Sequence, residues 1–152
     1  MMRIGVISDT HGLLRPEALD ALAGVDHVLH AGDVGDPQIL DALSSVAPLT
    51  AIRGNIDRVG RCGALSATEM VQLGGSTFYM LHDLHELDLN PAAAGIEIVV
   101  SGHSHQPSIE SRKGVLYVNP GSAGPRRFSL PVSIGFVMLS PGEPKADILR
   151  LL

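Results

Sequence analysis

Seven side chains of three polar types follow hydrophobic stretches of this sequence, at five separate places. Aspartate, histidine and asparagine together offer oxygen and nitrogen donors, a mixture that suits Mn, Fe, Ni or Zn better than Mg or Ca. One divalent ion takes about four to six ligands. Seven side chains plus water therefore fit two ions, about 3.5–4 Å apart as in phosphatases and nucleases, if one carboxylate bridges them. The candidates are Asp9, His11, Asp33, Asn55, His82, His103 and His105.

Each of these places also has an ordinary structural explanation. An aspartate at a strand end commonly caps the backbone, and Asp33 and Asn55 each follow a glycine, as turn residues do. His82 alone fits a polar strand end, and His103 with His105 alone fits a partly buried pair equally well. The hypothesis of a metal centre depends on the recurrence, because independent structural causes would have to repeat at five strand ends.

The first half of the chain predicts the elements that would bring these side chains together. Residues 3–9, 26–33 and 48–55 predict strands, the first of them buried on both faces. Between them, residues 15–24 and 36–46 predict helices, because each carries a proline near its first turn. This alternation implies parallel strands joined by right-handed crossovers. The carboxyl ends of such strands share one edge, where ligands bind in open α/β sheets.

The second half of the chain predicts mainly antiparallel strands. Two packed sheets with outer helices would bury all of these elements. Residues 56–69 show no clear period and predict a loop that is long enough to suspect a function. The predicted strands are the hairpin 69–83 turning at Gly74 and Gly75, the strand that begins at residue 96 and ends at Gly102, the hairpin 108–122 turning at Lys113 and Gly114, and residues 132–140 paired with 146–152.

Length and composition narrow the class of protein. The 152 residues suit one domain, residues 1–152, and no internal repeat or linker divides them. No apolar run reaches the roughly 18 residues of a membrane span, and the N-terminal stretch lacks the pattern of a signal peptide. Cys62 is the only cysteine, which fits a reducing compartment, so we expect a cytoplasmic protein without a membrane partner. A formal charge of −5 disfavours a long nucleic acid as partner.

The ordered motifs of the candidate ligands resemble those of a known family. In the order DTH, GD, GN, H and GHSH, they are similar to the calcineurin-like metallophosphoesterase superfamily. The short chain and the NPGS motif at residues 119–122 resemble its small bacterial and archaeal phosphodiesterase branch, which is similar in fold to the vacuolar sorting subunit of retromer. The resemblance implies an α/β fold, a four-layer α-β-β-α sandwich of two mixed sheets.

The same resemblance implies an activity and its cofactors. It predicts a phosphodiesterase in which a hydroxide bridging two divalent ions hydrolyses a small-molecule phosphate ester. Mn is the favoured metal, with Fe, Ni or Zn as alternatives. Two other functions stay open: a phosphomonoesterase of the same chemistry, and a non-catalytic scaffold of the same fold. The physiological substrate and the oligomeric state stay open as well.

Individual residues receive roles from this resemblance. One ion is assigned to Asp9, His11 and His105, the other to Asn55, His82 and His103, and the bridge between them to Asp33. The catalytic candidates are accordingly Asp33, Asn55 and His82.

The chain departs from the larger relatives directly after the GN motif. Many of those relatives carry a histidine there, which is understood as the proton donor to the leaving group, whereas this chain has Ile56. The proton donor stays open, and His85 is a candidate only by its position in the sequence. Arg126 could hold the phosphate, as Asn55 could, or form a salt bridge at the edge of the core. His30 is expected chiefly to pack, with orientation of the site as the alternative.

Overall fold

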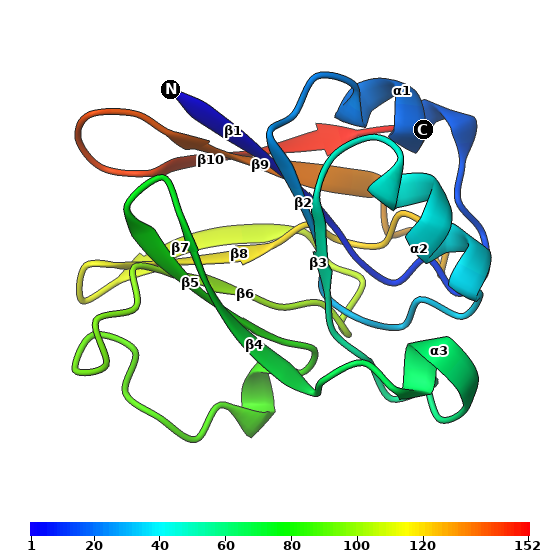
Figure 1. The fold of residues 1–152 in the computed structure, drawn as a ribbon, viewed down its shortest axis with the longest axis horizontal. Helices are drawn as coiled ribbons and strands as arrows, with labels where there is room; N and C mark the ends of the chain where they lie inside the picture. Colours follow the sequence, from blue (N-terminus) through cyan, green and yellow to red (C-terminus); the bar gives the residue numbers. More distant parts are fainter.

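In the computed structural model, residues 1–152 form two mixed sheets of five strands each (Figure 1). The first sheet, in the order β10-β9-β1-β2-β3, and its helices comprise β1 (Met2–Ile7), α1 (Pro16–Leu22), β2 (His27–His30), α2 (Pro37–Ser44), β3 (Leu49–Ala51), β9 (Ser133–Leu139) and β10 (Lys145–Arg150). The second, in the order β4-β5-β6-β8-β7, comprises β4 (Thr68–Leu73), β5 (Ser76–Leu81), β6 (Ile98–Val100), β7 (Ser108–Arg112) and β8 (Val115–Asn119). Two short helices complete the fold, α3 (Gly60–Gly63) and the 3-10 turn η1 (Leu84–Glu86).

Strand β1 lies in the middle of the first sheet because its residues suit burial on both faces. Ile4 and Val6 pack toward the second sheet, Ile7 packs toward the helices, and all three are fully buried. Gly5 leaves room for Leu22 of α1, which any larger side chain at this position would meet. β1 pairs in parallel with β2, as the predicted crossover requires, and antiparallel with β9.

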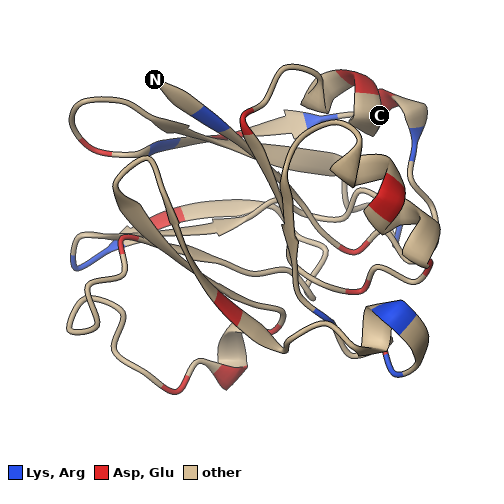
Figure 2. Ribbon diagram, in the orientation of Figure 1, with Lys and Arg blue, Asp and Glu red and all other residues tan.

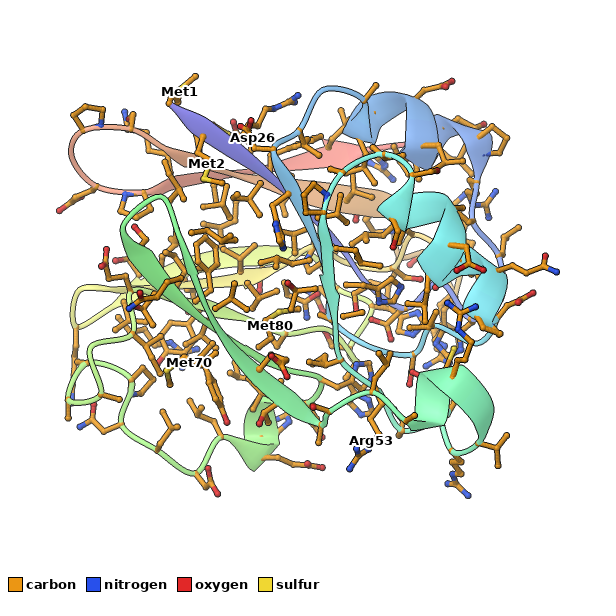
Figure 3. All side chains as sticks on the ribbon, in the orientation of Figure 1. Met1, Met2, Asp26, Arg53, Met70 and Met80 are labelled. Carbon is orange, nitrogen blue, oxygen red and sulfur yellow. The ribbon has the colours of Figure 1, made fainter.

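The layer between the two sheets is one of the two main parts of the apolar core. Ile4 and Val6 of β1 face Phe78 and Met80 of β5 across this layer, with Val118 of β8 beside them. Side chains fill the space between the sheets, and Met80 is fully buried among them (Figure 3). Burial of such side chains contributes about 1.5–3 kcal/mol each, so this layer fixes how the two sheets, and hence their ends, face one another.

The outer face of the first sheet is covered by helices and that of the second by irregular chain. Helices α1 and α2 pack Leu22 and Leu43 against the first sheet. On the second sheet, Tyr79 and Leu81 are covered by the segment that follows β5, which includes Leu84 of η1 and no α-helix. The two mixed sheets and the three predicted antiparallel pairs are confirmed, and the fourth layer is a thin irregular one.

Three predictions differ from the structure. The second half, predicted as mainly antiparallel, contains two parallel pairs, β5 with β6 and β6 with β8. The strand predicted over 48–55 ends at Ala51, and the chain then turns so that Gly54 can lie against Asp33. A Cβ atom at Gly54 would collide with the Asp33 carboxylate, so the glycine permits this approach. The segment 56–69, predicted as a loop without regular structure, contains helix α3. None of the helices has the length and apolar character that crossing a membrane requires.

Candidate metal centre

The carboxyl ends of β1, β2, β5 and β6 meet at one edge of the molecule and bring five of the predicted ligands together. Asp33 Oδ2 lies 3.3 Å from His11 Nε2 and 3.2 Å from His82 Nε2. Asp9 Oδ1 lies 3.4 Å from His105 Nε2 and 3.6 Å from His11 Nε2. Asp9 Oδ1 also lies 3.7 Å from His82 Nε2, so both aspartates lie between histidines that belong to different predicted ion sites.

Four buried polar atoms in this cluster have no partner in hydrogen-bonding geometry, although the two that belong to His11 and His82 lie 3.3 and 3.2 Å from Asp33 Oδ2. They are Asp9 Oδ1, His11 Nε2, His82 Nε2 and His105 Nδ1. An unsatisfied buried polar group costs about 1–3 kcal/mol, and a native structure needs a reason to keep one. Two sets of side chains have donor atoms within 4.8 Å of one another, namely Asp9, His11 and His105, and Asp9, Asp33 and His82. Carboxylate oxygen and imidazole nitrogen at this spacing fit divalent ions of the Mn, Fe or Zn type.

Each aspartate uses one oxygen for the protein and leaves the other facing the histidines. Oδ2 of Asp9 accepts hydrogen bonds from Ser8 Oγ at 2.7 Å and from the His103 backbone N–H at 3.1 Å. Oδ1 of Asp33 accepts from the Ile56 backbone N–H at 3.1 Å. These bonds fix the carboxylates in orientation, so the remaining oxygens, Asp9 Oδ1 and Asp33 Oδ2, point to the same small volume.

Asn55 and His103 lie beside this cluster, on its solvent side. His103 Nδ1 is 3.2 Å from Asn55 Oδ1, and the His103 ring meets the His82 ring edge to face at 5.2 Å. The His103 side chain is 45% exposed, whereas those of His82 and His105 are buried. The structure thus brings all seven predicted ligands to one place, five in the two tight sets and these two at the rim.

The backbone of this site is left-handed at most of its ligands. A positive φ is uncommon for a residue with a side chain and costs on the order of 1–3 kcal/mol where the surroundings impose it. Only Lys113 and Phe128 share this conformation elsewhere among non-glycine residues. Such strain gathers at functional sites. The ligands concerned are Asp9 (φ 56°), His11 (46°), Asp33 (58°), His103 (71°) and His105 (62°).

Hydrogen bonds to the backbone set the tautomers of two buried histidines. His82 Nδ1 donates to the Ala31 carbonyl oxygen at 2.7 Å, which leaves Nε2 as the atom available to an ion. Gly32 N–H donates to His30 Nδ1 at 3.1 Å, so His30 Nε2 carries the proton and donates to Thr10 Oγ1 at 2.9 Å. The Thr10 hydroxyl in turn donates to the Val34 carbonyl oxygen at 2.9 Å.

His30 therefore orients the site as well as packing in the core, which corrects the emphasis of the sequence-based expectation. It connects the loop that holds Asp9 and His11 to the loop that holds Asp33. Burial lowers the pKa of His30 to about 4, despite the attraction of Asp9 and other carboxylates. The imidazole is neutral at pH 7, as the fixed tautomer requires.

Charges within the cluster keep the carboxylates ionised. Burial opposes the ionisation of Asp9, but contacts with His105, His11 and Ser8 outweigh it and hold the pKa of its carboxyl far below the usual range. Burial likewise opposes the ionisation of Asp33, and contacts with His82 and the Ile56 N–H lower its pKa.

The histidines shift in the opposite direction. Burial alone would lower the pKa of His82, yet the contact with Asp33 and the charge of Asp9 raise it to about 9. The pKa of His11 is raised by its contact with Asp9, against burial and against the positive charge of Arg127. Two buried carboxylates that attract protons onto their neighbours also attract cations.

Asp57 is a residue that sequence reasoning left without a role at this site. Its buried carboxylate accepts three backbone hydrogen bonds, from Val34 N–H at 3.0 Å, Gly35 N–H at 3.0 Å and Gly54 N–H at 2.9 Å. It thereby ties the loop after β2, which holds Asp33, to the loop after β3, which holds Asn55. The aspartate two residues after the GN motif was the available indication in the sequence.

Three cavities border the metal centre: one of about 210 Å³ is lined by His85, Gly102 and His103, and the other two lie beside different ligands. A cavity of about 480 Å³ lies on the side of Asn55, His82 and His103, and its wall includes three carboxylates. The smallest one, of about 150 Å³, lies on the side of His11 and His105. The cavity of about 480 Å³ is lined in part by Arg53, Tyr79, Asp83, Glu86 and Asp88, the smallest by Pro125, Arg126 and Arg127.

Two further candidates from the sequence occupy contrasting positions. Arg126 lines the smallest cavity, where its Nε donates to the Leu130 carbonyl oxygen at 3.3 Å, and it forms no salt bridge. The His85 side chain is 96% exposed and bonds to Asp83 at 3.1 Å, and His85 lines the cavity of about 210 Å³ that His103 also lines. The Ile56 side chain is 42% exposed and offers no proton.

Two mixed sheets with a shared edge of aspartates and histidines agree with the class of phosphoester hydrolases that bind divalent metals. The chain belongs to the calcineurin-like phosphoesterase superfamily, whose domain model matches residues 2–142.

Relatives and solved structures agree with this membership. The chain is 34% identical over 161 aligned residues to a protein of Methanothermobacter thermautotrophicus named "Probable metallophosphoesterase", covering 98% of this chain and 92% of that one. The structure of an archaeal phosphodiesterase is 25% identical with a TM-score of 0.80 and covers 97% of this chain and all of that one. Vps29 of Chaetomium thermophilum has the same fold, with a TM-score of 0.78 at 16% identity over 99% of this chain and 97% of that one.

Proposed function

We propose that this protein is a phosphodiesterase that hydrolyses a small-molecule phosphate ester at a site for two divalent ions, with Mn favoured. The observation that carries the proposal is the cluster of buried atoms without a hydrogen-bond partner around the two aspartates, in which Asp9 Oδ1, His11 Nε2 and His82 Nε2 face one another. Two bound ions would supply an activated water and positive charge for the phosphoryl oxygens. The phosphodiesterase among the structural relatives supports a diester as substrate.

The chain's own residues would divide the work as follows. Asp9, His11 and His105 would hold one ion, and Asn55, His82 and His103 the other, with Asp33 between them; Asp9 belongs to both tight sets and would share this bridging position. The anchored oxygens of Asp9 and Asp33 would keep the ligand geometry fixed during turnover.

At the rim, the Asn55 side chain is exposed beside the larger cavity. Its amide N–H could donate to a phosphoryl oxygen while its carbonyl oxygen binds an ion. Arg126, on the opposite side, would offer a guanidinium to the substrate. We propose the cytoplasm as the compartment, since a lone buried cysteine suits reducing conditions.

The test measures metal content and hydrolysis together. Purified protein loaded with Mn is expected to bind two ions per chain and to cleave bis(p-nitrophenyl) phosphate faster than p-nitrophenyl phosphate. Asp33→Asn keeps the shape but removes the charge between the two ion sites, so activity at saturating Mn should fall by at least about 10–100-fold. Asp147→Asn, an exposed change of the same kind on β10, should leave activity unchanged.

Two results would contradict the proposal. Faster cleavage of the monoester would favour the phosphomonoesterase alternative. Two bound ions with no cleavage of either ester would favour the scaffold, for which the likeness to Vps29 supplies only the fold.

A further inference from the structure

We propose that the substrate carries a second anionic group beside the reacting phosphate, and that Arg126 and Arg127 bind this group on the His11 side of the metal centre. The inference rests on the proposed function and concerns its substrate class. Both arginines and Pro125 line the cavity of about 150 Å³ whose remaining wall is formed by His11 and His105. A ligand group in this cavity would lie next to one ion site and away from the other.

The segment that carries the arginines is fixed to the metal-ligand loop. Ser122 Oγ donates to the Asp9 carbonyl oxygen at 3.0 Å, and Ala123 N–H donates to the Ser8 carbonyl oxygen at 3.0 Å. Gly124 lies so close to the Asp9 and Thr10 backbone that a Cβ atom there would collide with it. Pro125 then restricts the backbone before the arginines.

A side chain from the opposite direction secures the same segment. Arg15 donates to the Gly124 carbonyl oxygen through Nη2 at 3.2 Å. The chain directly before Arg126 and Arg127 is therefore fixed relative to Asp9.

Neither arginine is neutralised within the protein. No carboxylate lies within 4.0 Å of Arg126 or Arg127, whereas Arg61 has Asp41 at 2.7 Å. Arg127 lines the same cavity as His11, beside one of the two ion sites. Arg126 Nε donates to the Leu130 carbonyl oxygen at 3.3 Å, but neither guanidinium has a carboxylate partner. Two such groups at one cavity are suited to the oxygens of phosphate or carboxylate.

The opposite flank of the metal centre would repel an anion. The larger cavity is lined by Asp83, Glu86 and Asp88, and Figure 2 shows acidic residues on the segment that follows β5, at the bottom of the view. Its arginine, Arg53, labelled in Figure 3, donates to the Leu65 carbonyl oxygen at 2.7 Å. The two bound ions would neutralise the charge of the reacting phosphate. The arginines therefore remain available to bind a second anionic group.

The experiment compares two non-hydrolysable ligands that differ by one anionic group. Methylphosphonate and methylenediphosphonate are titrated into the Mn-loaded protein by calorimetry, at one fixed concentration of free Mn. Arg127→Gln and Arg126→Gln should each raise the Kd of the diphosphonate by about tenfold, which is the effect of losing one hydrogen bond to a charged group. The Kd of the monophosphonate should rise by much less. Arg150→Gln is the matched control, because its Nε also donates to a backbone carbonyl oxygen at 3.3 Å.

Equal weakening of both ligands by the arginine changes would overturn the inference, because the arginines would then bind the reacting phosphate itself. Unchanged binding of the diphosphonate would overturn it as well. Diester cleavage by the unsubstituted protein is measured in the same preparations. Discrimination between the ligands without any cleavage would refute the proposed function and leave the anion site standing; cleavage without discrimination would do the reverse.

Discussion

Replacing Asp57 by asparagine is expected to loosen the metal centre without touching a ligand. Oδ2 of Asp57 accepts from Val34 and Gly54, and Oδ1 accepts from Gly35. Asparagine can keep at most the pair of bonds on one oxygen, and its NH₂ group then faces a backbone N–H that has lost its acceptor. Hydrogen bonds to a charged group contribute about 1.5–3 kcal/mol each. The free energy of unfolding should therefore fall by about 3 kcal/mol.

Two measurements follow this change. For a chain of this length, a loss of about 3 kcal/mol lowers Tm by roughly 6–12 °C. Calorimetric titration with Mn should show weaker binding, because Val34 adjoins Asp33 and Gly54 adjoins Asn55. Asp26→Asn is the control: its carboxylate also accepts a backbone N–H, from Arg3 at 2.8 Å, but it is exposed and precedes β2, away from the ligand-bearing ends. A lower Tm with unchanged Mn affinity would refute the argument that Asp57 positions the ligands.

Three further predictions concern the metals, acid stability and the leaving group. Chelation should lower Tm by several degrees, since ligand at about 100 times its Kd adds roughly 2.7 kcal/mol per site to the native state; an equal Tm with and without Mn would contradict this. The pKa of His30 is about 4 in the folded protein and close to 6.5 when unfolded, so its neutral form favours folding above pH 6.5. That contribution, about 3 kcal/mol, should be lost as the pH falls from 6.5 to 4, and denaturant titrations of His30→Gln should show a shallower acid dependence than the parent. Because Ile56 offers no proton and general-acid help is typically worth about 10²–10⁴-fold, cleavage should depend steeply on leaving-group pKa; a flat dependence, with chemistry rate-limiting, would show that an acid acts after all.

The sequence was sufficient to predict where the candidate ligands gather. Hydrophobic stretches of strand length, each ending in Asp, His or Asn, place those side chains at one sheet edge whenever the strands are parallel. The structure has this arrangement at β1 and β2, as predicted, and also at β5 and β6, whose parallel pairing was not predicted. The prediction did not depend on exact boundaries, since β3 ends four residues earlier than expected and Asn55 still reaches the rim.

What could not be predicted depends on backbone atoms that come from distant parts of the chain. The role of Asp57 requires three N–H groups from two loops, and its place after the GN motif does not indicate which groups these are. The tautomer of His30 requires Gly32 N–H on one side and Thr10 on the other. The irregular fourth layer escaped prediction for a different reason: Leu84 and the leucines after it cover Tyr79 without a helical period.

The left-handed backbone at the ligands has a consequence for how much of this protein a cell keeps. Asp9, His11 and Asp33 hold unfavourable conformations around buried atoms that lack partners. Bound ions would give those atoms partners, so the metal-free chain opens more often than the loaded one. Proteases degrade chains in proportion to the opened population when reclosing is fast. At a constant rate of synthesis, cells short of the preferred metal should therefore contain less of this protein, because its rate of degradation would rise as the metal concentration falls.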